Sequence, residues 1–228
     1  MYFDNAATSF PKPECVYDAV DAWMRGGAAS AGRGTHQKAE AAGQMIDECR
    51  RQLATLLGVP TPSQIVFTLN CTDSLNTVLQ GFLRRGDSVV ATALDHNSVL
   101  RPLEALKQRI AIDVQVLPFD PETGLIDEQR YSEALAAGKI RLVVLNHASN
   151  VTGRVQRVEA LTRVAHEQGA AVLLDAAQTA GHWPLNMAEL GVDFLAAAGH
   201  KGLLGPLGMG ILCIRRGMEN ELQPFRFG

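Results

Sequence analysis

Short apolar runs recur along the chain after residue 60, and segments with a helical pattern separate most of them. Seven such runs, rich in Val, Ile, Leu and Ala, occur at residues 64–69, 87–93, 112–118, 140–146, 170–176, 193–199 and 209–214. Helix-like segments lie between them at 72–85, 97–109 and 157–169. Apolar strands that alternate with helices are typical of a mainly parallel sheet that is covered on both faces.

The last two runs are joined in a different way from the others. Only a short glycine-containing loop, without a helix, links 193–199 to 209–214. Parallel strands need a crossover of about a dozen residues or more, so we expect the seventh strand to run antiparallel. The predicted fold class is therefore α/β, with three layers and a seven-stranded, mainly parallel sheet whose last strand is antiparallel.

Before residue 60 the pattern is helical. Residues 12–26 and 36–58 predict two helices, separated by a loop rich in Gly and Ala. The second helix is expected to end at Gly58 and to bury one apolar stripe. That stripe comprises Met45, Ile46, Cys49, Leu53, Leu56 and Leu57. We expect residues 1–60 to form a helical segment that packs on a large domain made by residues 61–228.

Composition and charge exclude several classes of protein. The net charge of −3 provides no basic surface for nucleic acid or an anionic membrane. No apolar run approaches the roughly 20 residues that span a bilayer, and the N-terminus has no signal-peptide pattern. The four cysteines form no CxxC pair, which argues against a zinc site and a disulfide framework. We expect a cytoplasmic protein that holds no metal and binds neither nucleic acid nor membrane.

Polar residues gather in the loops that follow the predicted strands. In an open α/β sheet, ligands bind at the carboxyl ends of the strands. Five of these loops carry side chains suited to chemistry, namely Thr72, His96, Asn150, Asp175, Gln178, His200 and Lys201. Ordinary explanations exist as well, because Thr72 and Asp175 could cap a helix, His96 could be a surface residue and Asn150 could close a turn.

Pyridoxal 5′-phosphate (PLP) is one cofactor that would use all of these residues at once. It requires a lysine that binds it covalently and a carboxylate that keeps its ring nitrogen protonated. It also requires a donor to the ring hydroxyl, a planar partner on the ring face and an anion site. In that order, the candidates are Lys201, Asp175, Gln178 or Asn150, His96 and Thr72. Neither a P-loop nor a GxGxxG fingerprint is present, so the common nucleotide sites are not indicated.

The chain resembles the class V aminotransferase family of fold-type I PLP enzymes, and within it the cysteine desulfurase and selenocysteine lyase group. The motifs that carry the resemblance span the chain in order: FDNAATSFPKP, RGTH, DHNSVLRPL, HASNVTG, DAAQTAG and GHKGLLGPLGMG. The resemblance implies the large domain of a fold-type I PLP-transferase. It also implies a homodimer with its active sites at the subunit interface.

The resemblance implies a role at the cofactor ring for five residues. Lys201 would form the Schiff base with the cofactor, and Asp175 would pair with the ring nitrogen. Gln178 would contact the ring hydroxyl, and His96 would stack on the ring as the second catalytic residue beside Lys201. Asn150 would lie near both the ring hydroxyl and the substrate carboxylate.

Two further groups of residues follow from the same resemblance. Cys71, Thr72 and His200 would hold the phosphate of the cofactor. Arg33 and His36, in the segment GGAASAGRGTH, are expected at the rim of the pocket, at or near a two-fold interface. There they would face the substrate or the partner subunit.

Members of this family are longer than this chain. In them, a following segment carries a catalytic cysteine and an arginine for the substrate carboxylate, and neither Cys71 nor Cys213 fits that cysteine. We therefore expect the large domain, without the C-terminal small domain, of an enzyme that converts L-cysteine to L-alanine and an enzyme-bound persulfide for a sulfur-acceptor protein. The alternatives are another class V enzyme (an aminotransferase, an epimerase or a kynureninase-like member) or a catalytically silent fragment.

Overall fold

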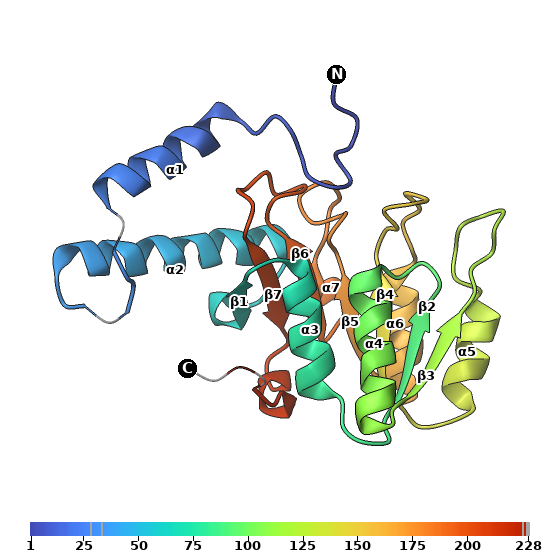
Figure 1. Cartoon of the computed structure of the whole chain (residues 1–228). Helices are drawn as coiled ribbons and strands as arrows, with labels where there is room; N and C mark the ends of the chain where they lie inside the picture. The colour runs from blue at the N-terminus through green and yellow to red at the C-terminus, as the bar shows by residue number, and fades with distance from the viewer. Residues whose placement is uncertain (28, 33, 225, 227–228) are drawn as a thin grey trace.

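In the computed structural model, which describes residues 1–27, 29–32, 34–224 and 226, seven strands form one sheet in the order β1-β7-β6-β5-β4-β2-β3 (Figure 1). The strands are β1 (Ile65–Thr68), β2 (Ser88–Thr92), β3 (Asp113–Leu117), β4 (Ile140–Asn146), β5 (Ala171–Asp175), β6 (Phe194–Ala198) and β7 (Gly210–Ile214). Each strand lies within one of the seven predicted runs, so this prediction is confirmed.

The last strand runs against its neighbours, as its short connection predicts. β7 pairs antiparallel with both β6 and β1, whereas all other neighbouring strands pair in parallel. Because β7 lies between them, β1 and β6 point the same way. The carboxyl ends of β1 to β6 therefore all meet at the same edge of the sheet, and the loops that follow them form one rim.

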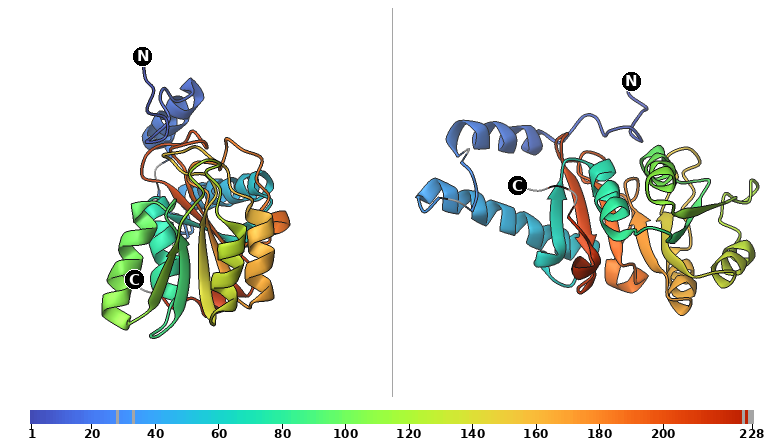
Figure 2. Two further views of the ribbon diagram at one scale, coloured as in Figure 1. Left: turned by 90° about the vertical axis from the view of Figure 1, so that its right-hand side faces the viewer. Right: turned by 60° about the horizontal axis from the view of Figure 1, so that its bottom comes forward.

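Helices cover both faces of the sheet (Figure 2). On one face lie α3 (Cys71–Phe82) and α4 (Asn97–Ile110); on the other lie the end of α2 (Gln37–Leu57), α5 (Glu128–Ala136), α6 (Val158–Glu167) and α7 (Met187–Leu190). Successive side chains of a strand enter opposite layers: in β5, Val172 and Leu174 join one core and Leu173 joins the other. Two packed cores thus hold the sheet rigid beneath its loops.

The N-terminal helices differ in how much they pack. α1 (Glu14–Gly26) buries no residue and stands away from the sheet in Figure 1. α2 buries Ala39, Ala42, Ala54 and Leu57, so its contact face is built largely from small side chains.

The predicted apolar stripe of α2 is partly wrong. Met45 and Leu56 are 45% and 53% exposed, because they lie on the flank of the face that Ala42, Ile46, Leu53 and Leu57 turn toward the protein. Across the described residues, no helix is both long enough and apolar enough to cross a membrane.

Candidate active site

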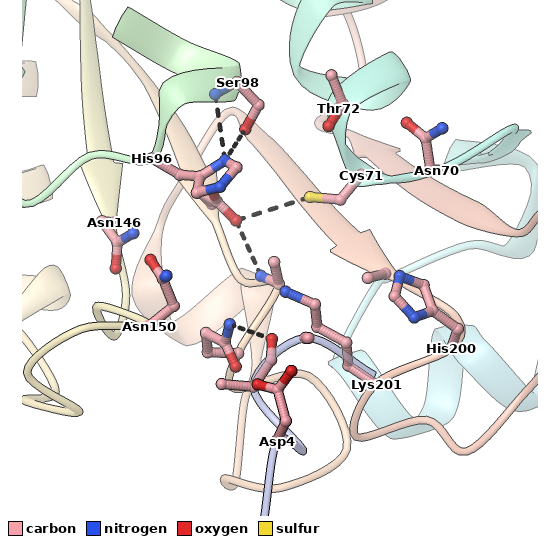
Figure 3. A pocket seen from close by; sticks show the side chains of 16 residues that line it. Asp4, Asn70, Cys71, Thr72, His96, Ser98, Asn146, Asn150, His200 and Lys201 are labelled. Atoms are coloured by element: carbon pink, nitrogen blue, oxygen red, sulfur yellow. Dashed lines mark hydrogen bonds between the residues drawn. The ribbon is translucent and has the colours of Figure 1, made fainter. Parts of the chain in front are cut away.

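The loops that follow β1, β2, β4, β5 and β6 surround a cavity of about 450 Å³ (Figure 3). Eight residues that the sequence assigns to a cofactor site line this cavity: Cys71, Thr72, His96, Asn150, Asp175, Gln178, His200 and Lys201. Figure 3 shows the Lys201 side chain extending into the middle of the cavity, with Asn146 and Asn150 on one side and Thr72 and His200 on the other. The sheet therefore brings together residues that are up to 130 positions apart, from Cys71 to Lys201.

One of the residues that line the cavity is a buried carboxylate. Asp175 is the last residue of β5 and is 4% exposed. Its Oδ1 accepts hydrogen bonds from the backbone N–H of Ala177 (2.9 Å) and from the thiol of Cys71 (Sγ–Oδ1 3.6 Å). Burial raises the pKa of Asp175, against the opposing effects of these two donors and of the Lys201 charge. A cation beside this carboxylate would favour its ionised form and so lower its pKa.

The thiol of Cys71 is a donor in this arrangement. Burial and the neighbouring carboxylate of Asp175 raise its pKa well above the usual range. Cys71 therefore stays protonated at neutral pH and supports Asp175, and this protonation state does not suit a nucleophile.

The N-terminus of α3 faces the cavity and can hold an anion. Asn70 is the N-cap, and its side-chain oxygen accepts from the N–H of Asp73 at 2.8 Å. From the sequence, Thr72 could be the cap of this helix, whereas in the structure Asn70 has that role. Cys71 and Thr72 thus occupy the first two helical positions, whose N–H groups have no acceptor within the helix. Such groups, together with the helix dipole, bind phosphate readily.

His96 is held in a fixed orientation at the opposite side of the cavity from this helix end. It is the N-cap of α4, and its Nδ1 accepts the backbone N–H of Ser98 at 3.1 Å and lies 2.8 Å from the Ser98 hydroxyl. Because a backbone N–H can only donate, Nδ1 carries no proton and the neutral ring is protonated at Nε2. The ring is therefore held in one orientation where it lines the cavity.

The loop that carries Lys201 is packed tightly onto the loop that follows β5. A Cβ on Gly181 would lie 2.4 Å from the carbonyl oxygen of Gly202, and a Cβ on Gly202 would lie 2.5 Å from that of Ala180. Gly181 also has a φ of +87°, which side chains rarely allow. Two glycines thus let the two loops touch backbone to backbone and fix the base of the lysine side chain.

The N-terminal segment crosses the mouth of the cavity. Asp4, Ala6 and Ala7 line it, and the Gln178 amide donates to the carbonyl of Ala6 at 3.0 Å. In the sequence, this segment stands out only as the motif FDNAATSFPKP, and no contact is predicted for it. Its apolar and small residues give no periodic signal, so its position could not be predicted from the pattern.

Asn146, the last residue of β4, was missed as a site residue. It lies directly beside Asp175 in the sheet register, lines the cavity and is 4% exposed. Among the described residues its Oδ1 has no hydrogen-bond partner, which is unusual for a buried amide and suits an acceptor kept for a ligand. A polar residue that closes an apolar strand was the signal that identified Asp175, and the same signal was present at Asn146.

The pKa of Asp95, the residue before His96, is raised to about 7, chiefly by burial. Its Oδ2 accepts from the N–H and hydroxyl of Thr92, and Oδ1 has no partner within the described chain. Between pH 4 and 7 the folded state binds the proton that the unfolded chain has lost, so this group makes stability fall as pH rises.

We therefore expect Asp95→Asn, which keeps an acceptor for Thr92 but cannot ionise, to raise the free energy of unfolding at pH 8 by about 2–4 kcal/mol and to leave it nearly unchanged at pH 4. Urea unfolding followed by circular dichroism at pH 4, 5, 6, 7 and 8 measures this. The exposed Asp18→Asn serves as the control. Parallel pH curves for Asp95→Asn and the unmodified protein would contradict the expectation.

Of the two residues expected at a subunit interface, only His36 is described. Arg33 lies outside the described residues. His36 is the exposed N-cap of α2, with its Nδ1 accepting from the N–H of Ala39 at 3.3 Å, and it does not line the cavity of its own chain. The interface role of both residues stays a prediction. Within the described ranges, no group of three or more His, Cys, Asp or Glu side chains is arranged to hold a metal ion.

Comparisons with known proteins agree with this picture. The family model "Aminotransferase class-V" matches residues 1–228. A "Probable cysteine desulfurase" of Methanothermobacter thermautotrophicus is 37% identical over 229 residues, covering all of this chain and 56% of the relative. A structure of an apo cysteine desulfurase from Thermococcus onnurineus NA1 is 35% identical with a TM-score of 0.93, and is covered over 56% of its length.

A third comparison includes a ligand. The structure described as "SspA in complex with cysteine" is 30% identical with a TM-score of 0.89, and this chain covers 65% of it. These structural matches extend over 100% of this chain and confirm the predicted fold. The chain spans about half the length of the curated relatives it matches.

Proposed function

Because the chain belongs to the class V aminotransferase family, we propose that it forms the cofactor-binding large domain of a PLP-dependent cysteine desulfurase. The observation that carries the proposal is the cavity at the carboxyl ends of the strands, which the Lys201 side chain enters and which a buried carboxylate, Asp175, also lines. In this proposal residues 61–228 are the domain proper, and residues 1–60 are a helical segment attached to it.

The residues of the cavity fit PLP in their chemistry. Lys201 is the amine that would bind it covalently. Asp175, whose ionisation burial disfavours, gains a counter-charge if the protonated ring nitrogen lies beside it. Thr72, the N-terminus of α3 and His200 would hold the phosphate, while the fixed ring of His96 would stack on the cofactor.

The donors to the ring hydroxyl are amide side chains. Gln178 uses one amide N–H on the Ala6 carbonyl and retains a second, and Asn150 lines the same cavity. The orphaned oxygen of Asn146 adds an acceptor beside Asp175. The cavity thus offers a partner for each polar edge of the cofactor.

When bound, PLP supplies an electron sink that stabilises negative charge on the substrate α-carbon. The protein's part is to hold groups around that carbon. The Nζ of Lys201, which extends into the cavity, would take the proton from the substrate α-carbon and return it. Asn150 would orient the substrate carboxylate, and the N-terminal segment would restrict water access at the mouth of the cavity.

The proposed overall reaction transfers one sulfur atom. L-Cysteine and an enzyme thiol give L-alanine and an enzyme persulfide: the carbon–sulfur bond of the substrate breaks, a sulfur–sulfur bond forms, and a proton replaces sulfur on carbon. Cys71 is tied to Asp175, and Cys213 is buried in β7 with its pKa raised to about 12. The reacting thiol would therefore come from a segment outside the matched half of the relatives. We further propose a cytoplasmic homodimer that passes sulfur to an acceptor protein.

The test uses two proteins. The 228-residue chain is incubated with PLP and then reduced with borohydride, and mass spectrometry locates the phosphopyridoxyl group, which we expect on Lys201. A longer form that includes the remaining half of the family's length is then assayed with L-cysteine for alanine and sulfide, in the presence of dithiothreitol, which reduces the persulfide and releases its outer sulfur as sulfide. Equal yields of both products support the proposal. Amino transfer to a keto acid without sulfide would replace it with an aminotransferase, and absence of PLP binding would remove it.

A further inference from the structure

We propose that Thr8, in the N-terminal segment, is a positioning residue that fixes the tautomer of His200, so that the ring donates Nε2–H into the cavity. The inference rests on the proposed function in one respect, namely that the acceptor of this donor is the phosphate of PLP. The tautomer itself is a property of this chain alone and can be measured without any cofactor.

Four donors of the N-terminal segment converge on the backbone next to the lysine. The carbonyl of His200 is approached by the Ser9 N–H (3.2 Å), the Ser9 hydroxyl (3.0 Å), the Thr8 hydroxyl (3.2 Å) and the Lys12 ammonium. A carbonyl oxygen has two lone pairs, so it cannot accept all four well. Some of these donors must use other acceptors.

The surrounding atoms settle which donors those are. The Ser9 N–H and the Lys12 ammonium both donate to the carbonyl of His200. The Ser9 N–H has no other acceptor in the described chain, and the Lys12 ammonium forms a strong hydrogen bond because it is charged. The Ser9 hydroxyl lies 3.0 Å from the Lys201 carbonyl and can donate there. The Thr8 hydroxyl lies 2.9 Å from Nδ1 of His200, nearer than it lies to the carbonyl. Its single proton is therefore best placed on the bond to Nδ1.

This assignment leaves one arrangement of the His200 ring. With Nδ1 accepting from Thr8, the neutral ring carries its proton on Nε2. In the opposite tautomer, Nδ1–H would donate to the Thr8 oxygen, and the Thr8 hydroxyl would have to donate to the His200 carbonyl. That carbonyl oxygen would then have three donors, because the Ser9 N–H and the Lys12 ammonium already bind it. Partial burial and the charges of Lys201 and Lys12 lower the pKa of His200, so the ring is neutral near pH 7 and its tautomer matters.

The consequence concerns the anion site. An Nε2–H group can donate to a phosphate oxygen. An unprotonated Nε2 is itself an acceptor, so its lone pair would repel that oxygen. His200 lines the same cavity as the N-terminus of α3, so both donors can converge on one anion. The N-terminal segment thereby contributes to phosphate binding without touching the phosphate.

The direct test is ¹⁵N NMR of the apo-protein at pH 8, with the His200 ring signals assigned by their loss in His200→Gln. We expect Nε2 to resonate as N–H and Nδ1 as an unprotonated nitrogen. In Thr8→Val, which removes the hydroxyl and keeps the shape, both nitrogens should move toward averaged values, and Thr8→Ser should restore the original pattern. A proton on Nδ1 in the unmodified apo-protein would overturn the proposal, even if Thr8→Val failed to fold.

The second readout compares PLP with pyridoxal, which lacks the phosphate. Thr8→Val should weaken PLP binding about tenfold and leave pyridoxal binding within about twofold, because only the phosphate meets Nε2–H. Thr55→Val, at an exposed threonine on α2, should change neither. Equal loss of both ligands would make Thr8 a merely structural residue. Failure of the unmodified protein to bind PLP would remove the proposed function while leaving the tautomer result intact.

Discussion

Replacing Lys201 by alanine is expected to abolish covalent attachment of PLP completely. The Lys201 ammonium extends into the centre of the cavity from a loop fixed by glycine contacts, and a carbon–nitrogen double bond can form only with an amine at that place. Lys12, which contacts the backbone beside Lys201, is already engaged with the Ser9 hydroxyl and the His200 carbonyl. Visible absorbance of the PLP-treated variant and borohydride reduction followed by mass spectrometry measure the loss.

A matched control separates this effect from a general loss of lysines. Lys139→Ala removes an exposed lysine in the turn before β4 and should leave the attachment unchanged. Non-covalent PLP binding by Lys201→Ala should persist, because the phosphate and ring contacts are intact. A reducible linkage in Lys201→Ala, at Lys12 or at any other lysine, would show that the lysine has been assigned wrongly.

Replacing Asp175 by asparagine should lower kcat of a full-length enzyme by about 10²–10³-fold while covalent attachment at Lys201 still occurs. The asparagine keeps the shape and an acceptor for the Ala177 N–H, but it lacks the charge that holds the ring nitrogen protonated. Loss of one preorganised electrostatic group commonly costs this much. Turnover of L-cysteine by the full-length form, measured as alanine, gives the rate.

Stability of the apo-protein distinguishes this effect from damage to the fold. Burial raises the pKa of Asp175, so its ionised form destabilises the empty protein as pH rises through the folded pKa. Asp175→Asn should therefore be as stable as the unmodified apo-protein at pH 7, or more stable. The exposed Asp113→Asn, at the start of β3, should change neither rate nor stability. A variant with unchanged kcat would show that the carboxylate does not serve the cofactor.

The sheet could be predicted from sequence because burial on both faces leaves a simple signal. Each strand is a short apolar run between polar loops, and the missing helix before β7 determines its direction. The contact face of α2 was less predictable, since the small residues Ala39 and Ala42 are buried in it while the larger Met45 and Leu56 lie at its flank. Large apolar side chains give a clear signal in the sequence, but the contact face of a helix often contains small residues such as alanine, which give little signal.

The candidate site was predictable where a functional residue follows a strand. His96 and Lys201 lie in the loops after β2 and β6, Asp175 is the last residue of β5, and parallel strands bring these positions to one rim. Contacts from distant segments were not predictable. Nothing local in the sequence places Thr8 against His200, 192 residues away, because that contact depends on the path of the whole N-terminal segment.

The contact between Gly181 and Gly202 also determines where this site can change during evolution or design. With backbone packed against backbone, any side chain at either position must displace a whole loop, so these two positions tolerate only glycine. Farther along the same loop, Leu207 is 72% exposed and meets no such limit. New substrate preferences would therefore come from residues on the outer part of the loops. The two glycines would meanwhile keep the Lys201 amine at the same position in the cavity.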